Sequence, residues 1–168
     1  MMNDKTRSET IFTGYLPGAI GRIVELQANY YHLDWGFGLF FEARVAKEMS
    51  EFLSRFDEAR DGFWIISLND RIEGGIAIDG IRARTDGAHL RWFILSPEVR
   101  GRGFGHRLME EAISFCKEKD YRNIYLDTFE GLHAARHLYE KFGFRLVTQA
   151  EGAQWGSKVT EQKFELIL

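Results

Sequence analysis

Cysteine and proline are scarce in this chain of 168 residues, which has one cysteine, Cys116, and two prolines. A single cysteine excludes an internal disulfide and a cysteine-rich zinc site. It also favours a reducing compartment, so we expect a cytoplasmic protein. No apolar run approaches the roughly 20 residues of a membrane-spanning helix. Residues 1–10 are polar and are predicted to be a flexible N-terminus rather than a secretory signal.

Excess positive charge is also absent, because 22 basic and 25 acidic side chains give a net charge of −3. The chain therefore has no general attraction for nucleic acid or for an anionic membrane, and any anion site must be local. At this length, 45% apolar side chains suffice for one compact core but not for two ordinary domains. We predict a single domain over residues 1–168, without repeats or linkers.

Two N-terminal segments have apolar residues at helical spacing. The first segment predicts a helix over residues 17–32, which starts at the breaker pair Pro17-Gly18. The second predicts an amphipathic helix with an apolar stripe of Val45, Met49, Phe52, Leu53 and Phe56. Between them two glycines interrupt a series of aromatic residues, so we expect a shaped loop over residues 30–41.

The rest of the chain alternates strands with helices. Residues 63–68 and 72–79 predict a hairpin, followed by a loop over residues 80–87 and a strand over 89–95. A helix to about residue 119, a strand over 124–128, a helix over 135–142 and strands over 144–149 and 159–168 complete the chain. This order is typical of a mixed α/β (α+β) sheet.

A glycine-rich segment, Arg-Gly-Arg-Gly-Phe-Gly over residues 100–105, lies between a predicted strand and a predicted helix. The first amides of a helix have no partner within it, and its dipole favours negative charge. Glycines let a phosphate approach the backbone, and Arg100, Arg102, His106 and Arg107 concentrate positive charge there. The segment therefore suits a pyrophosphate. The alternative is a glycine-rich turn with solvated arginines.

Neither common nucleotide fingerprint is present, because the glycine spacing is G-x-G-x-G rather than G-x-G-x-x-G or the P-loop pattern. A Rossmann interpretation would make Asp127 a ribose ligand. The position of the motif in mid-chain, after a hairpin, disfavours that interpretation.

Two motifs resemble those of the GCN5-related N-acetyltransferase (GNAT) family. Arg100, Gly103 and Gly105 fill its pattern Arg/Gln-x-x-Gly-x-Gly/Ala, and residues 135–144 are similar to its later signature A-x-x-L-Y-x-x-x-G-F. The resemblance implies a mixed, mostly antiparallel sheet of six to seven strands flanked by about four helices. More narrowly, residues 126–147 and 155–164 resemble the acetyltransferase half of MarR-GNAT fusion proteins, whose DNA-binding domain has no room here.

The resemblance implies acetyl-coenzyme A (acetyl-CoA) as the acetyl donor, with no metal. Amides near residues 102–105 would bind its pyrophosphate, strand backbone would pair with the pantetheine arm, and an amide near Ile94 or Leu95 would stabilise the oxyanion. The implied cofactor-binding residues are Phe93, Ile94, Leu95, Arg100, Gly101, Arg102, Gly103, Phe104, Gly105 and His106. Tyr139 stands where the family places its general acid, and the alternative is that it only packs in the core.

The sequence offers several candidates for the general base, because the glutamate common in the family's fourth strand is missing. His89 lies in that strand and has a suitable ordinary pKa, although a lone strand histidine is more often structural. Asp34, Glu42 and Glu130 are rivals, as bases or as partners of a cationic amine. Trp35 and its aromatic neighbours are expected either to line the acceptor pocket or to pack in the core. Trp155 has the same two roles open.

The sequence leaves alternatives open for the function, for metal binding and for the oligomeric state. Leu132 replaces an asparagine that contacts the cofactor in many members, which leaves a non-catalytic acyl-CoA-binding module as a second hypothesis. His133 and His137 are four residues apart but lack further metal ligands in the sequence. The partner is expected to be a small-molecule or peptide amine. A homodimer through terminal strands is compatible with the alternating pattern over residues 159–168, as is an ordinary internal strand.

Overall fold

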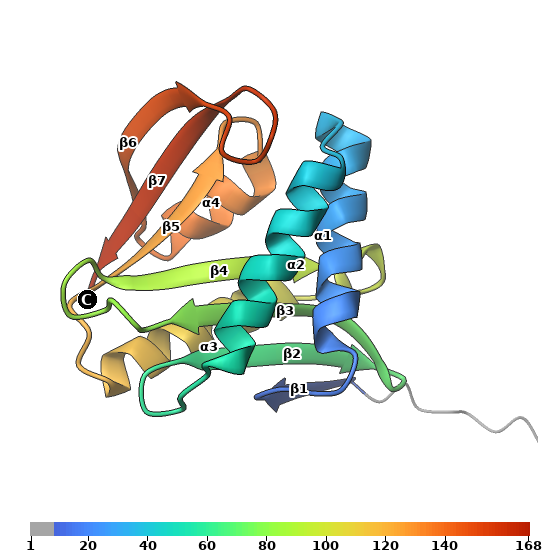
Figure 1. Cartoon of the computed structure of the whole chain (residues 1–168). Helices are drawn as coiled ribbons and strands as arrows, with labels where there is room; N and C mark the ends of the chain where they lie inside the picture. Colours follow the sequence, from blue (N-terminus) through green and yellow to red (C-terminus); the bar gives the residue numbers. More distant parts are fainter. Residues whose placement is uncertain (1–8) are drawn as a thin grey trace, which may run out of the picture.

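The computed structural model describes residues 9–168 (Figure 1). In chain order the elements are β1 (Glu9–Thr13), α1 (Ala19–Trp35), α2 (Leu39–Ser54), β2 (Gly62–Leu68), β3 (Arg71–Asp79), β4 (Ala88–Leu95), a 3-10 turn (Pro97–Val99), α3 (Phe104–Glu118), β5 (Asn123–Phe129), α4 (His133–Lys141), β6 (Arg145–Gly152) and β7 (Val159–Ile167). None of the helices within this part of the chain is long and apolar enough to cross a membrane.

The described strands form one seven-stranded sheet in the order β1-β2-β3-β4-β5-β7-β6. All neighbouring pairs are antiparallel except β4 and β5. The prediction of a mixed, mostly antiparallel sheet with about four helices is confirmed for residues 9–168. Strand β7 lies between β5 and β6, so residues 159–167 form an internal strand and β6 is the edge.

Helices cover both faces of the sheet, which creates two apolar cores (Figure 1). One core packs α3 and α4 against the sheet, and the other packs α1 and α2 against the opposite face. Strand β2 is buried at every residue because both of its faces are covered. Gly75 in β3 permits this close packing, since a Cβ there would lie 2.8 Å from the Trp64 carbonyl oxygen and 3.3 Å from Ile23 Cδ1.

The predicted loop over residues 30–41 is wrong for most of its length. Helix α1 continues to Trp35, and α2 already begins at Leu39, so only Gly36, Phe37 and Gly38 lie outside the helices. Gly36 ends α1 in the left-handed conformation, with φ of +70°. The aromatic residues on either side pack together across this short turn, which the sequence pattern could not show.

Strand β1 was not predicted. It pairs along its whole length with β2, from Glu9 opposite Leu68 to Thr13 opposite Trp64. Five residues have too little pattern of their own to indicate a strand, and the pairing partner lies more than 50 positions away. Residues 9 and 10 therefore belong to the sheet, while the rest of the predicted flexible N-terminus, residues 1–8, lies outside the described residues.

A buried ion pair connects the end of α2 to the sheet. The Asp79 carboxylate at the end of β3 accepts a hydrogen bond from Arg55 Nη2 at 2.6 Å and lies 3.7 Å from Arg91 Nη1. Burial alone would raise the pKa of Asp79. The hydrogen bonds from Arg55 and from the Ile81 amide, with the charges of both arginines, lower this pKa below its ordinary value of 3.8.

Replacing Asp79 by asparagine (Asp79→Asn) is expected to lower the free energy of unfolding by about 1–3 kcal/mol near neutral pH, because Arg55 loses its charged acceptor. The folded-state pKa lies below the unfolded-state value. The stabilisation is therefore present above pH 3.8 and is lost as the pH falls through the folded-state value. Urea unfolding from about pH 7 to about pH 3 measures the difference between the two proteins. The control is Asp86→Asn, which removes an exposed carboxylate paired with Arg82. A difference that stays constant over this range contradicts the prediction.

Candidate functional site

The site lies where β4 and β5 diverge. The two strands pair in parallel at only two positions, Ala88 with Ile124 and His89 with Tyr125. Figure 1 shows the β5–β7–β6 part of the sheet turning away from β4 beyond this point. From Leu90 onward, the backbone groups of β4 on this side therefore face an opening instead of a neighbouring strand, and they are available to a ligand.

A bulge shapes this edge of β4. The pairing with β3 leaves two residues of β4, Trp92 and Phe93, opposite the single Ile76. Trp92 has φ of +49°, a left-handed conformation that a bulky side chain rarely adopts. The Arg91 guanidinium lies 4.2 Å from the centre of the Trp92 ring system and helps to hold it. Bulges re-aim backbone and side chains next to active sites, and this one sets the direction of the Phe93 and Ile94 amides.

The glycine-rich segment forms an open cradle at the start of α3. Gly101 and Gly103 have φ of +71° and +83°, and a Cβ at either position would meet no atom within 4 Å. The Arg107 amide bonds to the Gly103 carbonyl, so the earlier amides of Phe104, Gly105 and His106 have no acceptor within the helix. Amides without an acceptor at a helix N-terminus, beside two glycines that have open space around them, fit a pyrophosphate.

The side chain of Arg100 contacts two other parts of the protein. Its Nε donates a hydrogen bond to the Leu95 carbonyl oxygen at 3.0 Å, and its guanidinium lies 4.9 Å from the centre of the Tyr30 ring. The side chain therefore joins the end of β4 to α1. It holds the cradle in place beside the opening.

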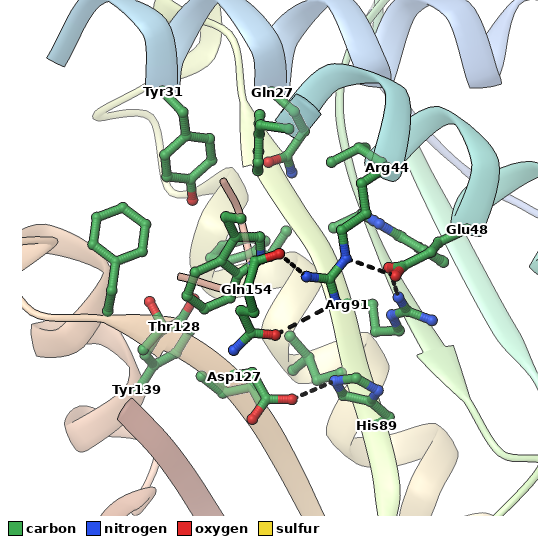
Figure 2. Close-up of a pocket in the computed structure, with 18 residues that line it drawn as sticks. Gln27, Tyr31, Arg44, Glu48, His89, Arg91, Asp127, Thr128, Tyr139 and Gln154 are labelled. Carbon is green, nitrogen blue, oxygen red and sulfur yellow. Dashed lines mark hydrogen bonds and ion pairs between the residues drawn. The ribbon is translucent and has the colours of Figure 1, made fainter. Parts of the chain in front are cut away.

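A cavity occupies the opening between β4 and β5 (Figure 2). It is roofed by α1, α2 and the loop between β6 and β7. Its lining residues are Gln27, Tyr31, Phe41, Arg44, Val45, Glu48, His89, Leu90, Arg91, Trp92, Phe93, Leu126, Asp127, Thr128, Phe129, Tyr139, Gln154 and Trp155. The two residues predicted to carry the chemistry, Tyr139 and His89, thus line the same cavity from different elements.

Tyr139 projects from α4 into this cavity and is 7% exposed (Figure 2). Its ring packs against Phe144 and Phe164, each at 6.0 Å between ring centres. Its hydroxyl is not among the buried side-chain atoms without a partner in residues 9–168, and Tyr139 lines the cavity. Burial raises the pKa of Tyr139, and nearby Tyr30 contributes to the same direction. The phenol therefore stays protonated at neutral pH and has an O–H to donate.

A salt-bridge network crosses the cavity between α2, β4 and the loop between β6 and β7. Glu48 on α2 accepts a hydrogen bond from Arg44 Nε at 2.8 Å and a second one from Arg91 on β4. Arg44 also donates to the backbone oxygen of Gln154, in the loop between β6 and β7. These contacts connect three separate parts of the chain over the cavity, as the dashed lines in Figure 2 show.

The predicted acceptor residues lie elsewhere. Trp35 packs against Phe129 at 5.3 Å between ring centres, behind the cavity wall. Glu42 is exposed on α2, and Glu130 lies at the mouth of a smaller pocket beside α4. Asp34 is exposed near the end of α1. The cavity lining includes none of Trp35, Asp34, Glu42 and Glu130. It does include Trp155 and Phe41, which is one of the aromatic neighbours of Trp35 in the sequence.

Sequence reasoning missed the network of Arg44, Glu48, Arg91 and Gln154. Arg44 and Glu48 are four residues apart on the polar face of an amphipathic helix, which sequence patterns assign to solvent. Their spacing signals only a local ion pair. Within residues 9–168, no three His, Cys, Asp or Glu side chains lie together so as to hold a metal ion.

Comparison with protein families supports the resemblance in the sequence. The model of the acetyltransferase (GNAT) family matches residues 23–144. The chain belongs to the GNAT family. It is an acetyltransferase whose cradle and Tyr139 lie inside the matched region.

Individual relatives of this GNAT chain are distant. It is 26% identical over 126 residues to a Bacillus subtilis (strain 168) protein assigned as a [ribosomal protein bS18]-alanine N-acetyltransferase, covering 75% of this chain and 74% of the relative. It is 25% identical over 137 residues to the uncharacterized Escherichia coli (strain K12) N-acetyltransferase YjgM, covering 80% and 79%.

Solved structures show the same fold at low identity. An acetyltransferase from Streptococcus agalactiae has a TM-score of 0.73 at 21% identity, with 95% of this chain and 98% of that chain covered. YncA from Salmonella typhimurium, solved with its cofactor acetyl-CoA, has a TM-score of 0.69 at 16% identity, with 95% and 94% covered.

The buried Tyr139 of this GNAT domain predicts an unusual titration. The absorbance of phenolate at 295 nm, recorded for the wild type and for Tyr139→Phe, isolates this tyrosine as the difference between two curves. Because burial raises its pKa, we expect no step in the difference near the ordinary value of 10 and ionisation only at higher pH. Circular dichroism over the same range checks that both proteins stay folded. A step at or below pH 10 contradicts the prediction.

Proposed function

We propose that this GNAT chain transfers the acetyl group of acetyl-CoA to a primary amine of a small molecule or a peptide. One observation carries the proposal: the unpaired edge of β4 and Tyr139 border the opening between β4 and β5, and the glycine cradle follows at the end of β4, where Gly105 lies close to Phe93 and Leu95. The bound cofactor of yncA and the N-acetyltransferase names of the relatives support it.

The cradle and the β4 edge fit the two ends of acetyl-CoA. When bound, this molecule supplies a thioester carbonyl carbon that an amine can attack. The amides near residues 102–105 hold the pyrophosphate, and the free backbone groups of Phe93 and Leu95 pair with the pantetheine arm. An amide near Ile94 or Leu95 donates to the thioester oxygen as negative charge develops on it.

Tyr139 acts as the general acid in this proposal. The amine nitrogen forms a bond to the thioester carbon, and the carbon–sulfur bond then breaks. The leaving thiolate takes the proton of the Tyr139 hydroxyl, which later regains a proton from solvent. The raised pKa of Tyr139 means that the phenol still has its proton when the leaving thiolate forms beside it. Because Tyr139 lines the cavity, its O–H can point at the sulfur.

His89 acts as the general base. The acceptor amine is a cation in solution and must lose a proton before its lone pair attacks. Of the carboxylates that line the cavity, Glu48 is occupied by two arginines, and Asp127 pairs with His89. A neutral imidazole is a better proton acceptor than a paired carboxylate at neutral pH, so His89 takes the proton, directly or through a water.

The cradle assignment predicts that a negative charge at Gly103 blocks cofactor binding. Asparagine and aspartate both tolerate the left-handed conformation and have nearly the same shape, so Gly103→Asn and Gly103→Asp form a matched pair. We expect acetyl-CoA to raise the melting temperature of the wild type, and its affinity to fall about tenfold more in the aspartate variant than in the asparagine variant. Thermal shift with acetyl-CoA, coenzyme A and NAD measures this. Equal binding by both variants, or stabilisation by NAD alone, contradicts the assignment.

The acid assignment predicts a selective loss of turnover in Tyr139→Phe. We expect kcat to fall about 100-fold or more while the affinity for acetyl-CoA stays within about twofold, because the hydroxyl protonates only the leaving thiolate. Release of the coenzyme A thiol is followed with a panel of primary amines that includes polyamines, amino-acid amides and alanine-initiated peptides. A variant as active as the wild type rules out the acid role.

A non-catalytic acyl-CoA-binding module is the second candidate. Leu132, which stands where many members have a cofactor-binding asparagine, is buried at the start of α4 and makes no side-chain cap there. Tight binding of acetyl-CoA with no acetylation of any amine in the panel favours this candidate over the enzyme.

Strand β6 is an edge strand with Leu146 and Val147 exposed, so we propose it, rather than the internal β7, as the strand through which two copies pair. The cytoplasmic location and the likeness to the acetyltransferase half of MarR-GNAT fusion proteins are supported by the sequence alone.

A further inference from the structure

We propose that Asp127 is the positioning residue of His89: its carboxylate fixes the orientation and the tautomer of the imidazole that takes the proton from the acceptor amine. This inference rests on the proposed function for the role of His89. The pairing of the two side chains, however, is a separate property and can be measured without turnover.

His89 and Asp127 meet where β4 and β5 begin to separate. His89 Nε2 lies 3.3 Å from Asp127 Oδ2, and Figure 2 shows the two side chains facing each other beneath the cavity. His89 is opposite Tyr125 in the last parallel pair, and Asp127 follows two positions later on the same face of β5. Because β4 and β5 separate beyond this pair, this is the point where short side chains of both strands still come within hydrogen-bond distance.

The imidazole is fixed from two directions. The Tyr125 ring stacks on it with 4.4 Å between ring centres and 12° between ring planes. The Asp127 carboxylate contacts its Nε2 edge. A histidine held on one face and one edge has little freedom to rotate, so the base would be oriented before the acceptor arrives.

The charges around Asp127 keep it ionised. Burial alone would raise the pKa of Asp127, but the hydrogen bond from His89, the charge of His89 when it is protonated, and the charges of Lys163 and Arg91 lower it below its ordinary value. Lys163 is held over the Tyr125 ring at 4.4 Å, on the neighbouring strand β7. Because its pKa is lowered, Asp127 is a weak base, but its carboxylate is still a good hydrogen-bond acceptor. It therefore orients His89 without replacing it as the base.

In the proposed step, the acceptor ammonium gives one proton to His89. The carboxylate favours the tautomer in which Nε2 bears the hydrogen and donates it to Asp127, which leaves the lone pair on Nδ1. One N–H bond of the acceptor ammonium breaks, its electron pair stays on the nitrogen, and the proton passes to Nδ1 directly or through a water. Asp127 then balances the charge of the imidazolium, which later releases the proton to solvent.

Asp127→Asn tests the assignment, because it keeps the shape and removes the charge. The first measurement is the tautomer of His89, from its two ring ¹⁵N shifts in a long-range ¹H–¹⁵N correlation spectrum of the labelled protein at neutral to mildly basic pH. We expect the Nε2–H tautomer in the wild type and a shift toward the Nδ1–H tautomer in the variant. The control is Glu165→Gln, which removes a carboxylate from the same face of the sheet, where it pairs with Asn123.

The second measurement is turnover with the primary amine that releases the coenzyme A thiol fastest. We expect Asp127→Asn to lower kcat about 100-fold with KM for the amine changed less than about threefold, and Asp127→Glu to restore part of the loss. His89→Ala should lose at least as much, and the double variant should lose little more, because the two residues act as one unit.

An unchanged His89 tautomer in Asp127→Asn overturns the assignment, and so does an unchanged kcat. Should the wild type acetylate no amine, that result counts against the proposed function alone. The tautomer then still decides whether Asp127 positions His89, since it is recorded without acetyl-CoA or acceptor.

Discussion

The short parallel pairing of β4 with β5 is the constraint on which the rest of the site depends. A parallel pair normally continues along both strands, since each further residue satisfies backbone donors and acceptors. Here the pairing stops after His89 and Tyr125, and the backbone groups of the following β4 residues remain free. The cost of these unpaired groups is acceptable only where water or a ligand reaches them. Because the two strands diverge, the central strand β4 has free backbone groups that can bind a ligand.

Side-chain contacts, rather than backbone pairing, fix the separation between the two halves of the sheet. On one face, Tyr31 and Phe37 pack with Phe129 of β5, and Phe41 of α2 packs on both of them, so that α1 and α2 are joined to the far half of the sheet. Above the cavity, Glu48 joins α2 to β4 through Arg91, and Arg44 extends the network to the loop after β6. Apolar contacts supply most of the stabilisation, while the charged network sets the position of the roof over the cavity.

The environment separates the acid–base properties of the groups around the cavity. Tyr139 is surrounded by aromatic rings, and burial raises its pKa, so it keeps its proton. Asp127 is also partly buried, but a hydrogen bond and three nearby basic groups lower its pKa, so it keeps its charge. A proton donor and an ionised carboxylate thus line the same cavity. Such a separation is typical of sites that both remove and deliver protons.

The sequence by itself determined the features that depend on neighbouring residues. The cradle is a contiguous segment at a strand–helix junction, the helices except for the α1–α2 turn follow their apolar periodicity, and Tyr139 belongs to a local motif. Only the tertiary structure decided which distant residues meet: β1 beside β2, Glu48 between Arg44 and Arg91, and Asp127 beside His89. The physical reason is that periodicity reports the face of an element, whereas these contacts depend on where the sheet pairs and where it opens.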